Sequence, residues 1–292
     1  MRNHFVQGIA LLMCTCSFAN SSAAQVKTES TQSDIGWSSY VEFAGTTNSD
    51  GQLFLIQPSV GYTFTQHFGM DVGLPLYFVH ASSTNTGGVS GSGVGNPSVD
   101  LRWKFLGPKV NYGSVFTGAA PLGDSKLGLS TGRATFDWTN HFDHSFNEVT
   151  PFLEAGLSNT TSDSREFLRP YTTLGFNTHF RGGMQVNAWK SAGIGAAGYY
   201  ILPFGDQTVF SRVSGASGNA ASASHGRSFQ YNQQTTGTAS IAVDNGFQAW
   251  VDASLNRYLN AELGYTRSVH YALNSVSFSL GFNVGRLLRE SN

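Results

Sequence analysis

Polar and apolar residues alternate strictly in many short stretches of this chain. Residues 98–105 read S-V-D-L-R-W-K-F, and residues 276–285 read V-S-F-S-L-G-F-N-V-G. Because successive side chains of a β-strand point to opposite faces, each stretch predicts a strand with one apolar and one polar face. Such stretches recur from residue 35 to residue 287. The sequence therefore predicts an all-β fold.

Two kinds of connection separate the stretches. The short ones are Thr65–His67, Gly107–Lys109, Phe142–Asn147, Arg181–Gly183, Pro203–Asp206 and Arg257–Asn260. The longer, polar ones are Thr46–Gly51, Ala81–Asn96, Gly123–Thr131, Ser158–Arg169 and Gly215–Asn245. Short periplasmic turns and longer external loops are typical of a transmembrane antiparallel up-and-down β-barrel. We therefore interpret the short connections as periplasmic turns.

These connections favour fourteen strands, within a range of twelve to fourteen. The predicted strands are 35–45, 52–64, 68–80, 97–105, 110–121, 132–141, 148–157, 170–180, 184–190, 193–202, 207–214, 247–256, 261–269 and 275–285. The weakest is 184–190, and without it a neighbouring segment must also merge, which leaves twelve. Pro58 cannot donate a ladder hydrogen bond, so we expect a bulge or break there.

The N-terminus has the features of an export signal. Arg2 is followed by the apolar run Phe5–Phe18 and by the small residues Ser22–Ala24, which together predict a cleaved signal peptide over residues 1–24. A short periplasmic segment, 25–34, then precedes a barrel domain over 35–292. Both cysteines lie inside the predicted signal peptide, so the mature chain has neither disulfides nor thiolate metal sites.

Composition favours a membrane barrel over its alternative, a soluble β-sandwich. Charged residues are 12% of the chain, against about 25% in an average soluble domain, and a sandwich would need a charged exterior. The mature chain has no apolar run near the ~18 residues of a transmembrane helix. The formal net charge of −1 comes without a basic patch, so we expect no nucleic-acid partner.

If the apolar faces meet lipid, the polar faces line a lumen. The charged and aromatic candidates for a solute path are Glu42, Asp71, Asp100, Arg102, Lys104, Arg133, Asp137, Glu154, Trp189, Trp250, Asp252 and Glu262. A charge inside a barrel must be paired or hydrated. These residues either brace the barrel or select solutes, and the two roles are compatible.

Catalytic, metal and cofactor sites have little support in the sequence. His141 and His144 have a spacing that binds metal on a helix, but they fall at a strand end with no further ligand frame. His270 has Ser268 and Ser275 nearby but no third residue to orient the imidazole. We therefore predict no enzyme, no metal and no cofactor.

Two segments resemble a known group of proteins. Residues 95–105, G-N-P-S-V-D-L-R-W-K-F, resemble the G-D-x-x-L-x-x-K-Y strand of bacterial outer-membrane proteins grouped with the MetA pathway of phenol degradation, and residues 256–265 resemble their penultimate hairpin. The group is transporter-like and distantly similar to fatty acid and toluene channels. Asn96 replaces the usual acid of the motif. With only about ten residues before the first strand, the sequence lacks the hatch of the fatty acid channels.

The sequence therefore predicts a passive channel or transporter in the cell outer membrane, exported through its signal peptide. The resemblance implies small organic solutes, aromatic or otherwise apolar ones included. The expected partners are outer-membrane lipid, the solutes and the barrel-insertion machinery, while nothing specifies an oligomeric state. The alternatives are a structural or surface-interaction barrel with a closed lumen and, third, an outer-membrane barrel enzyme.

Overall fold

The computed structural model describes residues 35–49, 51–81, 91–125, 129–161, 171–189, 191–213 and 229–290. The predicted signal peptide and the segment 25–34 lie outside these ranges. The part of the predicted loop Gly215–Asn245 that precedes residue 229 lies outside them too. Most of the described chain is β-strand, with one 3-10 helix, η1 (Ala239–Ala242), and one C-terminal helix, α1 (Val284–Glu290). Neither helix combines the length and apolar character that crossing a membrane would require.

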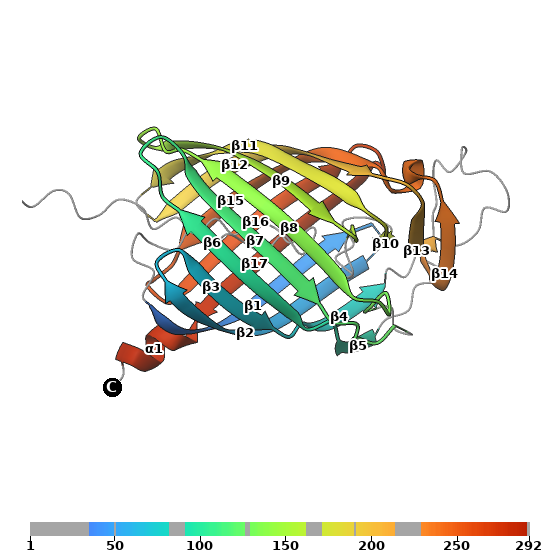
Figure 1. Cartoon of the computed structure of the whole chain (residues 1–292), viewed down its shortest axis with the longest axis horizontal. Coiled ribbons are helices and arrows are strands. Elements are labelled where there is room, and N and C mark those ends of the chain that lie inside the picture. The colour runs from blue at the N-terminus through green and yellow to red at the C-terminus, as the bar shows by residue number, and fades with distance from the viewer. Residues whose placement is uncertain are drawn as a thin grey trace, which may run out of the picture.

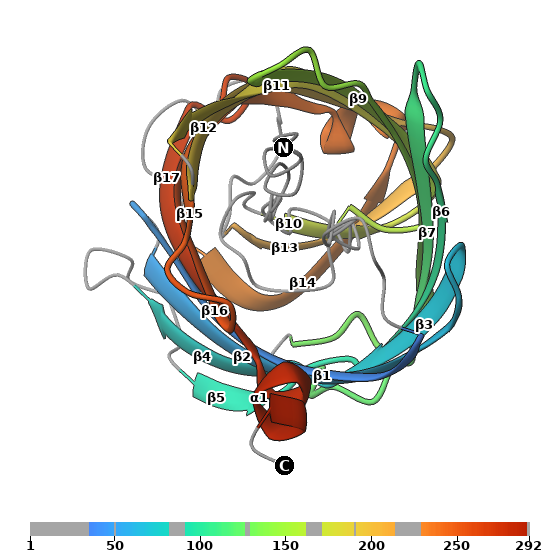
Figure 2. The same cartoon turned by 90° about the vertical axis from the view of Figure 1, so that its left-hand side faces the viewer.

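The main sheet closes on itself as an antiparallel barrel (Figures 1 and 2). Its first strand, β1 (Gly36–Asn48), pairs with both β2 (Gly51–Thr65) and the last strand, β17 (Leu273–Asn283). The closed ring also contains β3 (Phe68–Gly73), β6 (Ser98–Phe105), β7 (Asn111–Ala119), β8 (Thr135–Asp143), β9 (Val149–Ser158), β11 (Asn177–Trp189), β12 (Ala192–Pro203), β15 (Asp244–Ser254) and β16 (Leu259–Ser268). The predicted barrel is thus confirmed, with twelve strands in its ring rather than the favoured fourteen.

Two short strands extend the ring at one end. β4 (Leu76–Ala81) and β5 (Gly91–Val94) continue β3 and β6 beyond breaks in those strands. β2 pairs with β4 through residues 51–56 and with β3 from residue 59 onwards, and Pro58 lies between the two. The break expected at Pro58 is therefore in the neighbouring strand, because β2 itself runs on without interruption.

A second sheet of three strands lies at the same end. It contains β10 (Tyr171–Leu174), β13 (Gln207–Val213) and β14 (Phe229–Gly237), which continue β11, β12 and β15 respectively along the chain. In Figure 1 this sheet stands across the right-hand end of the barrel, and in Figure 2 it lies within the outline of the ring. The predicted strand 207–214 therefore belongs to this sheet and not to the ring.

Two predicted turns differ from the structure. Arg181–Gly183 lies in the middle of β11, which joins the predicted strands 170–180 and 184–190. Pro203–Asp206 comprises the last residue of β12 and the link to β13, at the end with the long connections. The other predicted short connections do lie together, at the end of the barrel where α1 follows β17 (Figure 1).

Burial of polar and apolar side chains is the reverse of that in a water-soluble protein. On β17, Phe278 is 39% exposed, whereas its neighbour Ser277 is 2% exposed. Large apolar side chains are exposed around the whole ring, from Phe43 on β1 to Leu280 on β17. An outward apolar surface with a polar interior is the arrangement that a lipid bilayer requires of a barrel.

Aromatic side chains contact one another beside the short turns. Trp37 and Tyr62 have ring centroids 5.1 Å apart, and the contacts continue through Phe64 and Phe68 to Trp103. Aromatic girdles of this kind flank the apolar band of membrane barrels, because flat or amphipathic rings suit the headgroup region. This girdle marks one boundary of the apolar surface.

Candidate functional site: the inner face of the barrel

Ten of the twelve predicted lumen residues lie on the polar face of the ring. They alternate with exposed apolar residues and therefore point into the barrel: Glu42, Asp71, Asp100, Arg102, Lys104, Asp137, Glu154, Trp250, Asp252 and Glu262. The pairing of the strands brings many of them together. Asp71, for example, is directly opposite Asp100, and Asp252 is opposite Glu262.

The other two residues lie elsewhere. Arg133 is exposed in the connection between β7 and β8, two residues before β8 begins. Trp189 is the last residue of β11 and is 65% exposed. A register shift between Val186 and Trp189 ends the regular alternation, and such a bulge re-aims the side chains that follow it.

One charged group of the inner face spans β3, β6 and β7. The Arg102 guanidinium forms a salt bridge with the Asp71 carboxylate. Beside this pair, the Thr117 hydroxyl donates a 2.7 Å hydrogen bond to Asp100 Oδ1. Asp100 therefore accepts a hydrogen bond from an uncharged side chain. The positive charge of Arg102 lies near the carboxylates of both Asp71 and Asp100.

A second group contains a carboxylate, a hydroxyl and an imidazole. The Thr139 hydroxyl lies 2.6 Å from Asp137 Oδ1 and 2.9 Å from His179 Nε2, and His179 Nδ1 lies 3.7 Å from Asp137 Oδ2. The Thr139 hydroxyl donates to the carboxylate, so its proton is engaged there and not with the imidazole. This geometry links β8 to β11 across β9, which lies between them, and it is not that of an activated nucleophile.

The third group is the largest and combines charge with aromatic rings. Arg181 Nη1 donates to Glu154 Oε2 at 3.1 Å, and His141 Nδ1 lies 3.0 Å from Glu154 Oε1. The Arg181 guanidinium carbon also lies 5.2 Å from the ring centre of Phe152 and 5.1 Å from that of Trp250. A guanidinium near aromatic faces gains cation–π attraction in addition to its ion pair.

Three titratable members of these groups were not among the predicted lumen residues: His141, His179 and Arg181. The sequence placed His141 at a strand end and Arg181 in a turn. The signal that could have found His179 and Arg181 is the alternation of Asn177, His179, Arg181 and Gln185 with the residues between them.

Opposite the charged groups, the inner face of β16 and β17 is rich in hydroxyl groups, and its one carboxylate, Glu262, is opposite Ser279. Ser275, Ser277 and Ser279 on β17 are all buried, as is Thr266 on β16. On the adjoining β15, Asp252 accepts a 2.8 Å hydrogen bond from Gln185 Nε2. This sector of the lumen wall is therefore rich in hydroxyl groups and poor in charge.

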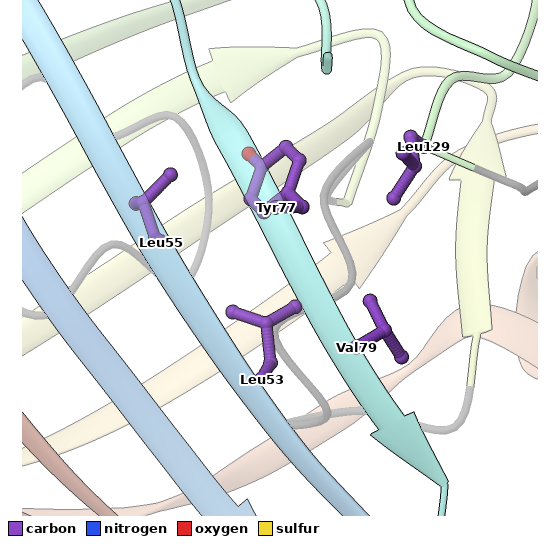
Figure 3. Close-up of a cluster of buried hydrophobic side chains, with 5 residues drawn as sticks. All are labelled: Leu53, Leu55, Tyr77, Val79 and Leu129. Atoms are coloured by element: carbon purple, nitrogen blue, oxygen red, sulfur yellow. The ribbon is translucent and has the colours of Figure 1, made fainter. Parts of the chain in front are cut away.

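An apolar patch lies on the inner face of β2 and β4, near the end with the long connections. It consists of Leu53, Leu55, Tyr77 and Val79 and is covered by Leu129, which reaches it from the connection between β7 and β8 (Figure 3). Leu129 is only 1% exposed. The patch is therefore an apolar contact between the barrel wall and the connection that carries Leu129.

The described residues contain no group of three or more His, Cys, Asp or Glu side chains placed to hold a metal ion. Near His270, the Ser268 hydroxyl donates to Asp244 Oδ1 at 2.6 Å, while His270 packs its ring against Tyr271. Ser268 is therefore engaged with a carboxylate and not with an imidazole.

Comparison with known proteins supports the fold. No family model and no curated protein matches the sequence. Among solved structures, an outer membrane channel from Pseudomonas putida F1 has a TM-score of 0.57 at 11% identity, over 87% of this chain and 97% of that one. At this identity the likeness shows a shared fold, and it agrees with the ring described above.

Other porin structures are more distant. The NanC porin has a TM-score of 0.49 at 5% identity, and the KdgM porin has 0.46 at 7%; each comparison covers 83% of this chain and 98% of the other. These two scores add nothing to the assignment of the fold.

Proposed function

We propose that this protein is a passive channel of the bacterial outer membrane that conducts small organic solutes. One observation carries the proposal: a closed ring of strands has apolar side chains outside and polar side chains inside. That combination fits a barrel that stands in lipid and encloses an aqueous path. Export through a cleaved signal peptide and insertion by the barrel-insertion machinery are part of this proposal.

The solute class is supported by the mixture of surfaces inside. The charged groups around Arg102 and Arg181 suit polar functions of a solute, while the inward rings of Phe152 and Trp250 suit an aromatic or aliphatic portion. Ligand sites commonly pair an apolar lining with a few placed polar groups. Catalysis is not part of the proposal.

The decisive experiment is single-channel recording on the purified barrel in planar lipid bilayers. A channel gives discrete current steps. A barrel with no conductance under any condition would favour the second candidate, a closed barrel that interacts with partners through its loops. That candidate gains some support from the three-stranded sheet, which lies across one end of the ring (Figure 2).

We expect the open channel to prefer small cations. The inward carboxylates of the described strands are Glu42, Asp71, Asp100, Asp137, Asp143, Glu154, Asp244, Asp252 and Glu262, and the inward bases are Arg102, Lys104 and Arg181. A low-dielectric wall concentrates the field of this acidic excess. Reversal potentials in a salt gradient measure the preference. It should weaken at high salt because the Debye screening length becomes shorter.

Replacing both Asp100 and Asp137 with asparagine should reduce or reverse the cation preference. Glu148→Gln is the matched control, because Glu148 lies exposed in the turn between β8 and β9. Anion preference in the unmodified protein would contradict the role given to the inner carboxylates.

We expect the end with the long connections to face the cell exterior. Two exposed residues can be replaced by cysteine to test this: Ser240 in η1 at that end, and Lys109 in the turn between β6 and β7. An impermeant thiol reagent should label Ser240→Cys on intact cells and Lys109→Cys only after permeabilisation. The opposite labelling pattern would reverse the orientation, and labelling of both in a soluble fraction would support a periplasmic protein.

A further inference from the structure

The three-stranded sheet meets the barrel at breaks in three neighbouring strands. β10 and β11 are separated by Gly175 and Phe176, β12 and β13 by Phe204–Asp206, and β14 and β15 by η1 and its flanking residues. Within the sheet, the antiparallel pairing of β10 with β13 and of β13 with β14 is intact. The sheet is therefore one hydrogen-bonded unit whose three links to the ring lie side by side.

One side chain joins two of these breaks. The Gln207 amide nitrogen donates to the carbonyl oxygen of Phe176 at 3.0 Å and to that of Phe204 at 2.9 Å. Gln207 is fully buried, and its Oε1 has no hydrogen-bond partner. The two donors of the amide therefore clamp the β10–β11 break to the β12–β13 break, beside a 2.7 Å backbone hydrogen bond from the Phe204 nitrogen to the Phe176 oxygen.

The third break has a separate polar contact. The Tyr271 hydroxyl, from the connection between β16 and β17, lies 3.1 Å from the carbonyl oxygen of Val243 and 3.4 Å from that of Ile241. Next to it, Val209 of β13 packs with Ala242 of η1 in a small apolar cluster. The attachment of the sheet thus rests on a few hydrogen bonds and one small cluster.

Residues 159–161 run beside β10 and also contact the ring. The backbone nitrogen of Phe136 on β8 donates to Asn159 Oδ1 at 2.7 Å, and Asn177 Nδ2 on β11 donates to the carbonyl oxygen of Thr160 at 2.9 Å. The Thr160 hydroxyl donates to the carbonyl oxygen of Thr173 at 2.7 Å, and the backbone nitrogen of Thr161 donates to the Thr173 hydroxyl at 3.1 Å.

Gly205 at the second break adopts φ +62°, in the left-handed region, with no atom within 4 Å of the position of a Cβ. The space beside Gly205 is therefore open.

From this arrangement we propose that the sheet β10–β13–β14 is a hinged lid over the mouth of the barrel, held closed by the Gln207 clamp. The inference rests on the proposed channel function and extends it, because it assigns the element that controls entry. When the Gln207 amide leaves the two carbonyls, the sheet swings away from the mouth as a unit. A few hinge residues then absorb the change, as in other lids.

The test measures the lid position separately from conduction. Thr46→Cys places a thiol on the inner face of β1 near the covered mouth, and the two native cysteines lie in the predicted signal peptide. Its rate of labelling by a bulky impermeant maleimide on intact cells reports access through the mouth. Gln207→Glu keeps the shape of the side chain but loses the donors, so we expect labelling and channel open probability to rise several-fold.

Three further variants complete the test. Gln207→Asn reaches one carbonyl at most and should have an intermediate effect, while Thr208→Val on the same strand should have none. A disulfide between Val209→Cys and Ala242→Cys should slow labelling below that of the unmodified protein, and reductant should restore it. Heat-dependent gel mobility identifies which variants keep a folded barrel.

The outcomes separate the lid from the channel. Unchanged labelling in folded Gln207→Glu and Gln207→Asn would overturn the lid, whatever the current. Faster labelling without current in any variant would uphold the lid and overturn the proposed channel. Faster labelling together with a higher open probability supports both.

Discussion

Leu101→Arg should prevent insertion of the barrel into lipid, while Asp100→Asn should leave insertion intact. Leu101 lies on the apolar face of β6, where it pairs with Met70 on one side and Phe116 on the other. A charge at this position near the middle of the bilayer costs ~2–4 kcal/mol. Asp100 points inward beside Thr117, so loss of its charge changes the lumen and not the lipid contact.

Insertion is measured by refolding into lipid vesicles and scoring heat-dependent mobility on gels. The two variants form a matched pair, since they are adjacent on one strand and differ in the face they present. Equal tolerance of both changes would mean that the two faces of β6 do not divide lipid from lumen.

Arg181→Met should be the most destabilising change on the inner face. It removes the guanidinium that pairs with Glu154 and lies against Phe152 and Trp250, and both charged side chains of the pair are only 12% exposed. Removing one partner of a buried pair costs about 3–5 kcal/mol, because the other charge stays buried. We expect a loss of this size in the free energy of unfolding by guanidinium in vesicles.

The double variant Arg181→Met/Glu154→Gln should recover part of that loss, because it removes the stranded carboxylate as well. His141 can still hydrogen-bond to the glutamine oxygen at its present position. If the single and double variants were equally stable, the charge of Glu154 would not be the source of the loss. Full stability of Arg181→Met would show that the pair is hydrated and contributes little.

Sequence alternation predicted the strands well where both faces are regular. The β6 and β17 segments were recognised because polar residues alternate with large apolar ones over their whole length. The same rule placed most of the carboxylates on the inner face. The alternation of polar and apolar residues therefore predicts both the strands of this barrel and which side chains point inward.

The Gly182–Gly183 pair shows where this approach failed. It was interpreted as a turn, but a Cβ on Gly183 would lie 2.1 Å from the backbone oxygen of Ala196 on β12. Glycine at this position permits close approach of two strands, a role that a single sequence does not separate from a turn. The error split β11 and hid Arg181 from the list of inner residues.

The three-stranded sheet was missed for a different reason. Its strands pair with one another through registers such as Leu174 with Thr208 and Gln207 with Gly237, and no local pattern encodes those partners. The predicted turn Pro203–Asp206 marks a real interruption of the chain, but the strand beyond it leaves the ring. Periodicity detects that a strand is present and does not specify the sheet to which it belongs.

The seam between β1 and β17 constrains how the protein can assemble. Across it, Asn283 Nδ2 donates to the Tyr40 hydroxyl at 2.9 Å, a contact between residues 243 positions apart in the chain. Contacts of such high sequence separation form late, because the loop-closure entropy must be overcome first. Until the last strand arrives, β1 and β16 each present an unpaired edge to which another chain can add. The final tenth of the sequence thus protects the nascent barrel from aggregation as well as completing its wall.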